Sequence, residues 1–591
     1  MSRKSPVFVL MMLLLLALVA CDGGNQPSST QVSTTNNGVP RPANAIEISI
    51  VYAPESEQYM PKVIEDFNRA MSQGNNPATG QALASGQRPV YITGEDGSSG
   101  TVMQGIVNAI IAPSNANVNR PTIFGPSVSH WYALANYQSG RPLFDLSQAR
   151  ATALAPVVMA IWESRLEAIR ETVGYEDIGW EELLGVLNSE NGWQDYGLEN
   201  ARRTVYYGHT DPLVSSTALS TLIAEFYASA RSNGFTERRL NLQQVNDPDV
   251  QQGVRDIEQL IRHYSTRTTE FKEYIAQGPD YLDFVALEEN DLIYINRGLT
   301  EYRPPERLVA LYPKEGTFWH EHPLAVVNAD WVTPEQAEAA RLFIDYVLTP
   351  DVQRAIMEQG FRPANPDVEL GFPFVEENGV APEGPATVLD VPAPEVIAAI
   401  QQSWAFVKKQ ADILLVIDVS GSMGNDGKID QARQAALAFL DGMEPTNRVG
   451  LAFFSNGYEL RVPVANFETN ESQLRSHIQS MRPEGGTELY MAVRDSVKAM
   501  TESTSDGRIR AVVVLSDGED TGERNISLND AVASINASRD SLNPVIVVPV
   551  AYGADADINA LNAIARASAT RVVSGDPQNI NSVLEIISSY F

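Results

Sequence analysis

The chain of 591 residues predicts an α/β fold, and three observations support this prediction. From about residue 45 to the end, apolar runs of strand length alternate with segments whose apolar residues recur at helical spacing. The run 413–417 is apolar throughout, as in a parallel strand buried on both faces. It ends in a polar loop, and a helical pattern reaching residue 440 follows. The length exceeds that of one domain, so two or three domains are expected.

The polar loop after the run 413–417 is the first candidate site. It places Asp418, Ser420 and Ser422 in the pattern Asp-x-Ser-x-Ser, followed by the flexible stretch 424–427. Ligands of open α/β sheets bind beyond the carboxyl ends of strands, which favours a binding role here. Taken alone, the motif fits turn formation and helix capping equally well.

Two further loops carry oxygen-bearing side chains at equivalent places. Thr487 lies in the stretch 485–488, just before another helical pattern. Asp517 follows the apolar run 509–515 directly. The candidate side chains offer only hard oxygen atoms, which suits Mg²⁺, Mn²⁺ or Ca²⁺ and argues against zinc.

On these motifs, the region 411–591 resembles a von Willebrand factor type A (VWA) domain with a complete metal-ion-dependent adhesion site (MIDAS). The resemblance implies a doubly wound fold and a metal held by Asp418, Ser420, Ser422, Thr487 and Asp517. Two carboxylates roughly neutralise a divalent ion, so the ion can accept an acidic side chain from a protein partner as its last ligand. This chemistry is binding and not catalysis.

The overall charge excludes one class of partner. The chain holds 43 Lys and Arg against 74 Asp and Glu, a net charge of −31. Nucleic acid would be repelled, and no compact basic cluster offsets the acidity. An exposed extracellular surface accounts for such a charge, as does ordinary solvated surface.

The first 21 residues predict an export signal. Arg3 and Lys4 precede an apolar run over 7–20 that is too short for a comfortable membrane span. The segment 18–21 resembles a bacterial lipobox, which implies lipidation of Cys21, the single cysteine of the chain. An ordinary cleaved signal is the alternative. Residues 22–44 are polar and predict a disordered tether above the membrane.

Residues 45–395 read as a long alternation of strands and helices, enough for two cores. The strands are expected at 46–52, 90–93, 122–125, 156–161, 204–208, 292–295, 308–312 and 324–327. Two helix starts are sharp, because Thr333-Pro334 and Thr349-Pro350 each combine an N-cap residue with a first-turn proline.

This region resembles the type II periplasmic solute-binding fold, with two α/β lobes around a cleft. The resemblance rests on the turn 98–101, the segment 211–217 and the late region 312–363. It implies a first lobe of 45–145 plus 300–395, with the second lobe between these segments.

Hydroxyl-rich loops that open helices are the candidate ligand-binding residues of the lobes. Their backbone N–H groups could hold an oxyanion or a carboxylate, although simple helix capping explains them as well. The neighbouring Glu95 and Asp96 count against a small anion, so the ligand stays open. The candidates are Ser98, Ser99, Thr101, Ser127, Ser129, Ser215, Ser216 and Thr217.

The remaining segments carry weaker signals. His320-Glu321-His322 lacks the spacing of a zinc enzyme, and we expect it to be a surface loop. Residues 364–395 are rich in Pro, Glu and Gly and predict a linker or an irregular wrap. A helix over 396–410 is expected to connect the lobes to the C-terminal domain.

The sequence therefore predicts a lipid-anchored, extracytoplasmic bacterial lipoprotein with two binding modules and no catalytic centre. The alternative is the receptor of an ABC-type importer, with the C-terminal domain as an accessory. A metal-dependent phosphatase built on Asp418 is a third hypothesis. It is disfavoured because Ser420 stands where a second carboxylate would serve as general acid or base.

Overall fold

The computed structural model describes residues 38–588, except for 114–119, 202–204, 260, 266–267, 280, 504–506, 523–524, 540–543, 554, 569, 571 and 577–579. The predicted export signal, Cys21 and most of the predicted tether lie outside the described residues. Within the described part of the chain, no helix has the length and apolar character needed to cross a bilayer.

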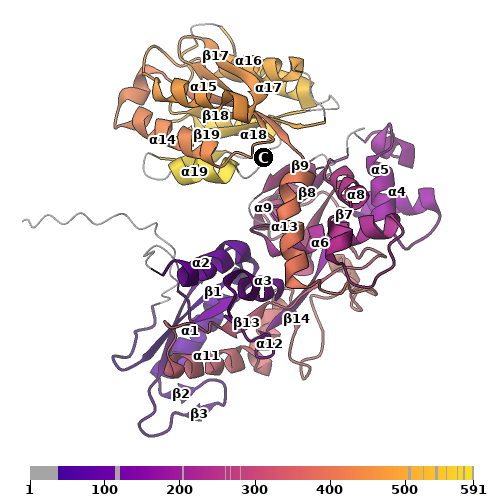
Figure 1. Cartoon of the computed structure of the whole chain (residues 1–591), viewed down its shortest axis with the longest axis vertical. Helices are drawn as coiled ribbons and strands as arrows, with labels where there is room; N and C mark the ends of the chain where they lie inside the picture. Colours follow the sequence, from indigo (N-terminus) through magenta and orange to yellow (C-terminus); the bar gives the residue numbers. More distant parts are fainter. Residues whose placement is uncertain are drawn as a thin grey trace, which may run out of the picture.

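The described chain builds three α/β units, each on its own large sheet (Figure 1). The first lobe has a five-stranded sheet in the order β4-β1-β5-β13-β6. Its strands are β1 (Ile46–Tyr52), β4 (Val90–Asp96), β5 (Ile123–Gly125), β6 (Arg150–Ala151) and β13 (Pro323–Val326), with a small hairpin β2 (Asn75–Asn76) and β3 (Gln81–Ala82).

Helices cover both faces of this sheet. One face packs against α1 and α11, and the other against α2 and α3. The helices are α1 (Met60–Ser72), α2 (Ser99–Ile111), α3 (His130–Ser139), α11 (Pro334–Val347) and α12 (Pro350–Glu358), with a 3₁₀ turn at Pro54–Gln58. Thr333 caps α11 by accepting from the Gln336 backbone N–H, as its sequence predicts.

The second lobe has a seven-stranded sheet whose main path is β11-β7-β10-β8-β9. Its strands are β7 (Ala153–Trp162), β8 (Tyr207–Thr210), β9 (Ile261–Ser265), β10 (Phe284–Glu288), β11 (Leu308–Leu311), β12 (Trp319–His320) and β14 (Arg362–Pro363). Its helices are α4 (Glu163–Val173), α5 (Trp180–Leu187), α6 (Ser216–Ser232), α7 (Leu242–Val245), α8 (Pro248–Glu258), α9 (Thr268–Ile275) and α10 (Glu289–Asn296), with 3₁₀ turns at Gly192–Tyr196 and Glu376–Asn378.

The long strand β7 joins the two lobes. Its first residues, Ala153 and Ala155, are buried in the core of the first lobe with α1 and α11. Its last residues, Val158 to Trp162, are buried in the second lobe. One continuous strand therefore runs through both cores and limits how far the lobes can separate without bending it.

Two expectations about this region were wrong. Residues 292–295 belong to helix α10 and not to a strand, because a short apolar run has no decisive period and the acidic start at Glu289 and Asp291 suits a helix N-terminus. Strand β11 pairs antiparallel with β7, so residues 308–311 belong to the second lobe and not the first. Sequence order alone cannot say which sheet accepts a returning strand.

The chain leaves the lobes through an irregular stretch and one helix. Phe374, Val380 and Leu389 of the stretch 364–393 are buried against the second lobe. Helix α13 (Pro394–Val407) then packs along the same lobe, with Trp404 buried between Tyr264 and His209. Figure 1 shows α13 lying on this lobe, directly before the C-terminal domain.

The C-terminal domain has a six-stranded sheet in the order β17-β16-β15-β18-β19-β20. Only β17 runs antiparallel to its neighbour. The strands are β15 (Ala411–Asp418), β16 (Arg448–Phe454), β17 (Tyr458–Asn466), β18 (Ile509–Ser516), β19 (Val545–Tyr552) and β20 (Val573–Gly575). The helices are α14 (Lys428–Asp441), α15 (Phe467–Gln479), α16 (Leu489–Glu502), α17 (Leu528–Arg539), α18 (Ile558–Ala567) and α19 (Ile580–Ser588).

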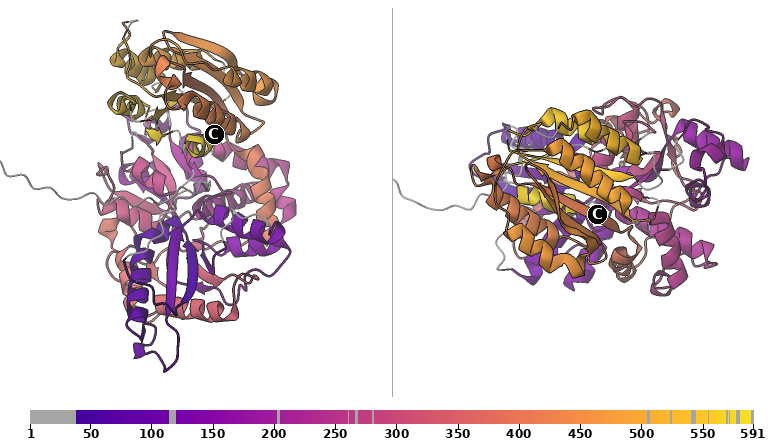
Figure 2. Two further views of the ribbon diagram at one scale, coloured as in Figure 1. Left: turned by 90° about the vertical axis from the view of Figure 1, so that its left-hand side faces the viewer. Right: turned by 90° about the horizontal axis from the view of Figure 1, so that it is seen from above.

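Alternate residues of the central strand β15 face two different layers of helices. Ile413, Leu415 and Ile417 pack with α14, α15 and α19. Leu414 and Val416 pack with α16, α17 and α18. Figure 2 shows the sheet edge-on between these layers. The doubly wound prediction is confirmed, and it explains why this strand is apolar at every position between Asp412 and Asp418.

Candidate functional site

The candidate metal site lies where the connections of the C-terminal sheet change direction. From β15 the chain moves outward to β16 and β17, and then returns to β18 on the other side of β15. Asp418 is the last residue of β15, and Asp517 directly follows β18. The two carboxylates therefore end neighbouring parallel strands, at the place where open α/β sheets bind ligands.

The side chains at this edge touch one another. Ser420 Oγ lies 2.8 Å from Ser422 Oγ, and Ser422 Oγ donates to Asp517 Oδ1 at 2.8 Å. Thr487 is close to both loops, since a Cβ placed on Gly518 would lie 3.7 Å from Thr487 Oγ1 and 3.8 Å from Ser422 Oγ. Ser420 N donates to Asp418 Oδ1 at 2.8 Å, so the structure brings all five predicted metal ligands into one cluster.

Backbone hydrogen bonds hold the three loops in register. Gly421 N donates to Gly485 O at 3.0 Å, and Glu484 N donates to Val419 O at 2.7 Å. Thr521 N donates to Thr487 O at 2.7 Å, which joins the second loop to the third. The cluster is therefore preorganised and does not depend on side-chain contacts alone.

The donor set fits a hard divalent cation. Asp418, Ser420, Thr487 and Asp517 are buried, whereas Ser422 is partly exposed and gives the cluster its access to solvent. Burial and the nearby Asp517 charge raise the pKa of Asp418 to about 6, against hydrogen bonds from Ser420 and Ser516 that lower it. Two buried carboxylates this close favour a cation between them.

Lys428 is a member of this cluster that the sequence reasoning missed. Its Nζ donates to Asp517 Oδ2 at 2.8 Å, and the side chain is only 7% exposed. Lys428 is the first residue of α14, where the helix dipole disfavours a positive charge. A lysine at the start of a helix is unfavourable unless an anionic side chain lies beside it. Its position in the sequence could therefore have indicated such a partner.

The hydroxyl-rich loops of the two lobes also come together, in direct contact. Gly100 N at the start of α2 donates to Val214 O at 2.9 Å. A Cβ on Gly100 would lie 2.0 Å from Leu213 O, so only glycine permits this approach. Trp131 Nε1 of the first lobe donates to Ser216 Oγ of the second at 2.9 Å.

Most of the predicted ligand hydroxyls form bonds within the chain. Ser127 Oγ donates to Glu55, Ser129 Oγ donates to Glu321, and Ser99 Oγ accepts from the Ser127 backbone. Ser215 Oγ caps α6 through Ala218 N, which is the capping alternative raised by the sequence. Thr101 is exposed and Ser98 is partly exposed.

Thr217 differs from these hydroxyls. It is 1% exposed, and its Oγ1 has no hydrogen-bond partner among the described residues. A buried hydroxyl without a partner is costly unless something else binds it. Among the predicted ligand-binding residues, Thr217 is therefore the one whose surroundings best suit a ligand contact.

The prediction of a surface loop at His320 and His322 was wrong. Both imidazoles are buried at the junction of the lobes and bind the two oxygens of Glu288, at 2.7 and 2.8 Å. Burial alone raises the pKa of Glu288, but the charges and hydrogen bonds of His322 and His320 outweigh it and lower the pKa to about 2. His320 ends β12, whereas His322 lies in the link to β13 with a φ of 38°, so strand alternation does not set the place of its ring; the turn brings both rings to Glu288.

Comparisons with known families agree with the two parts of the chain. A model described as "Bacterial extracellular solute-binding protein" matches residues 179–382, and one described as "von Willebrand factor type A domain" matches residues 413–519. Inter-alpha-trypsin inhibitor heavy chain H4 of Bos taurus is 31% identical over 124 residues, and that of Homo sapiens is 30% identical over 122. Each match covers 19% of this chain and 13% of the relative.

Two solved structures are similar in the C-terminal domain. The von Willebrand factor type A structure from Catenulispora acidiphila is 18% identical, with a TM-score of 0.28, and the match covers 31% of this chain and 42% of that one. The vWF domain of the type V pili tip protein Mfa5 from Porphyromonas gingivalis is 14% identical, with a TM-score of 0.26, covering 30% and 94%.

Replacing Lys428 tests how its charge acts on the cation site. We expect Lys428→Met to tighten Mg²⁺ binding at least about tenfold, because a buried positive charge beside Asp517 opposes a second cation. The exposed Lys498 on α16 provides the matched control, and Lys498→Met should leave the affinity unchanged. Isothermal titration with Mg²⁺ measures both, and equal affinities in the two variants would contradict this role.

Replacing Glu288 tests the buried histidine pair. Glu288→Gln should lower the free energy of unfolding by about 3 kcal/mol at pH 7, because it leaves buried partners unsatisfied. The pKa of Glu288 is depressed to about 2, so its stabilisation is present above pH 4.5 and is lost as the pH falls toward 2. The difference from wild type should therefore shrink over that window.

Tryptophan fluorescence during urea denaturation measures this effect in the right part of the chain, because all 7 tryptophans precede residue 405. The exposed Glu335 supplies the control, and Glu335→Gln should change the free energy by less than about 0.5 kcal/mol. If the difference in free energy of unfolding between Glu288→Gln and wild type grew as the pH fell from 4.5 toward 2, this prediction would be contradicted.

Proposed function

Because the chain combines a bacterial solute-binding-protein domain with a C-terminal von Willebrand factor type A domain, we propose that it is an extracytoplasmic binding protein. In this proposal the VWA domain captures a protein partner through a divalent metal ion, Mg²⁺ or alternatively Mn²⁺ or Ca²⁺. The solute-binding lobes recognise a small ligand. Lipidation of Cys21 anchors the chain to the outer face of the bacterial cell membrane, and no catalysis is involved.

The observation that carries the proposal is the convergence of five oxygen-bearing side chains from three loops. Asp418 and Asp517 supply two negative charges, and the three hydroxyls are neutral. An ion held in this way keeps its positive character toward an acidic side chain of a partner. Ser422, the partly exposed member, marks the direction from which that side chain would approach.

Lys428 strengthens the argument for an acidic partner. Its ammonium group neutralises part of the charge of Asp517 and also lies 3.5 Å from the exposed Asp555, so a bound divalent ion together with Asp418, Asp517 and Lys428 carries a net positive charge. Such a site attracts a carboxylate and repels cationic side chains, which provides specificity as well as affinity. The cost is weaker metal binding, which suits an environment where divalent ions are plentiful.

Metal-dependent capture tests the proposal. Immobilised wild-type protein should retain a partner from the native envelope in Mg²⁺, release it in EDTA and retain it again in Mn²⁺. We expect Asp517→Ala to lower the affinity for that partner at least about 100-fold, equivalent to about 2.7 kcal/mol. Asp441→Ala, an exposed aspartate at the far end of α14, is the control and should bind normally. Retention of the same partner in EDTA would reject the proposal.

The second candidate function is that of a transport receptor for an ABC-type importer, with the VWA domain as an accessory. The match to the extracellular solute-binding family over residues 179–382 favours it. In that case the dominant activity is tight binding of a solute, and it is independent of the metal. The contact of the two hydroxyl-rich loops supports a cleft that closes around a ligand between the lobes.

Thr217 provides a sharp test of solute binding. Thr217→Val removes a buried hydroxyl that has no partner among the described residues, so we expect stability to hold or rise while solute affinity falls about tenfold. Thr221→Val, one turn later on α6, is the control, because Thr221 Oγ1 already donates to Thr217 O at 2.7 Å. Thermal shift across a metabolite panel identifies the solute, and equal affinity in both variants would place the ligand elsewhere.

A further inference from the structure

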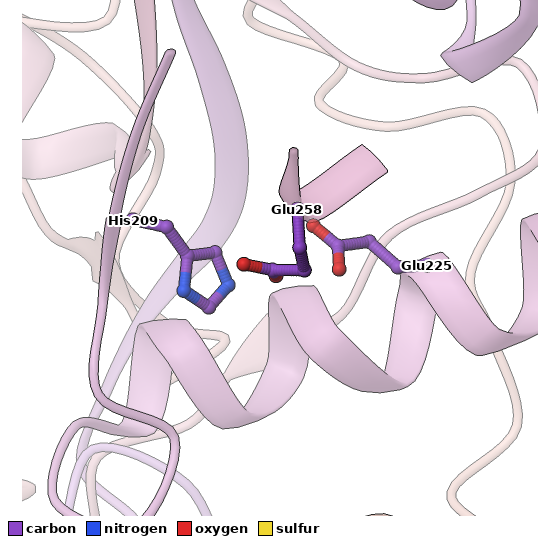
Figure 3. A group of neighbouring side chains, drawn as sticks. All are labelled: His209, Glu225 and Glu258. Carbon is purple, nitrogen blue, oxygen red and sulfur yellow. The ribbon is translucent and has the colours of Figure 1, made fainter. Parts of the chain in front are cut away.

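A second cluster of side chains that could hold a metal ion lies in the second lobe (Figure 3). His209 comes from β8, Glu225 from α6, and Glu258 is the last residue of α8. One potential ligand atom of each lies within 4.8 Å of the other two. All three side chains are at most 1% exposed.

The inner atoms of this trio lack partners. His209 Nε2, Glu225 Oε2 and Glu258 Oε1 have no hydrogen-bond partner among the described residues, unless a shared proton joins the two neighbouring carboxyl groups. Figure 3 shows the imidazole and the two carboxyl groups directed toward one another. Buried polar atoms in native proteins are almost always satisfied, so three such atoms at one point indicate a missing common partner.

The outer atoms of the same side chains are all held. His209 Nδ1 donates to Thr210 O at 2.6 Å, which leaves the lone pair on Nε2 facing the other two groups. Tyr264 Oη donates to Glu258 Oε2 at 2.6 Å, and Tyr207 Oη donates to Glu225 Oε1 at 3.4 Å. Such outer partners orient the ligands of natural metal sites.

From this arrangement we infer that His209, Glu225 and Glu258 bind a divalent transition metal ion, with Zn²⁺ as the reference ion. One imidazole nitrogen and two carboxylate oxygens suit Zn²⁺, Mn²⁺ or Fe²⁺ better than the hard Mg²⁺ and Ca²⁺. With zinc bonds of about 2.0–2.2 Å and tetrahedral angles, ligand atoms lie about 3.4 Å apart, so the three side chains, whose ligand atoms lie within 4.8 Å of one another, move together by up to about 1.4 Å when the ion binds.

The position of the site suggests what the ion does. The His209 ring stacks on Trp404 of α13 with centroids 5.7 Å apart, and Tyr264 packs edge-on against the same indole. Lys409 N, just before β15, donates to Tyr264 Oη at 2.9 Å. An ion here therefore fixes β8, α6 and α8 beneath the helix that carries the VWA domain, and so stiffens the joint between the two modules.

Metal analysis of the full chain tests the site. Because the cluster is buried, the ion enters during folding, so the protein is expressed with added zinc and then dialysed against excess Mg²⁺. We expect about one zinc per chain in wild type and in Asp418→Ala, and none in His209→Gln. Co²⁺ in place of zinc should give visible absorption bands that disappear in Glu258→Gln.

His130→Gln is the matched control. His130 is also buried, and neither of its ring nitrogens has a hydrogen-bond partner among the described residues, but it packs on Phe318 outside the trio. This variant should keep its zinc. A zinc that disappears in Asp418→Ala but persists in His209→Gln is bound at the oxygen site, and that result overturns the inference.

Thermal unfolding separates the metal site from a pair of carboxyl groups that merely share a proton. A bound ion predicts that zinc raises the melting temperature of wild type but not of Glu225→Gln, and that the variant melts below the zinc-loaded wild type. Proton sharing alone predicts no effect of zinc and a variant as stable as wild type or more so. That second outcome, or wild type free of zinc, manganese and iron after supplemented expression, overturns the inference.

Discussion

The repulsion between buried carboxylates is the constraint on which this molecule depends. Asp418 and Asp517 end neighbouring parallel strands, because the sheet order places β18 beside β15. Neither carboxylate can move away, since backbone hydrogen bonds join the three loops around them. Their negative charges therefore have to be balanced locally, and the chain supplies only part of that balance through Lys428. The proposed metal ion would balance the remainder.

Buried carboxylates also occur in the lobes, where three different kinds of surroundings accommodate their charge. Glu288 is balanced by two imidazoles at the junction of the lobes. Lys272 Nζ lies 2.8 Å from Asp291, forming a buried ion pair. Glu225 and Glu258 have a neutral histidine and two tyrosines around them, with no cationic group within hydrogen-bonding distance among the described residues. The charges of Lys408 and Lys409 lower the pKa of Glu258 but do not offset the effect of its burial, so the charge of this cluster is only partly balanced.

Continuity between the modules comes from two elements. Strand β7 passes through the cores of both lobes, and α13 packs along the second lobe before the chain enters β15. The carboxyl end of β15 carries Asp418, and its amino end follows the contact between Lys409 and Tyr264. One strand therefore spans the distance from the inter-module joint to the proposed MIDAS.

The sequence by itself determined what depends on local pattern: the doubly wound C-terminal domain, strands such as β1 and β15, the capped start of α11, and the five side chains that meet at the oxygen site. Those residues lie in loops at one edge of the sheet. The parallel arrangement of the strands brings these loops together. Only the tertiary structure decided the pairing of β11, the burial of His320 and His322, and the approach of Lys428 to Asp517. It also brought together His209, Glu225 and Glu258, although a lone Glu225 within the buried helix 216–230 was a signal. These contacts join residues that are far apart in the chain. The local spacing of apolar residues predicts helices and strands, but it does not predict which distant side chains come into contact.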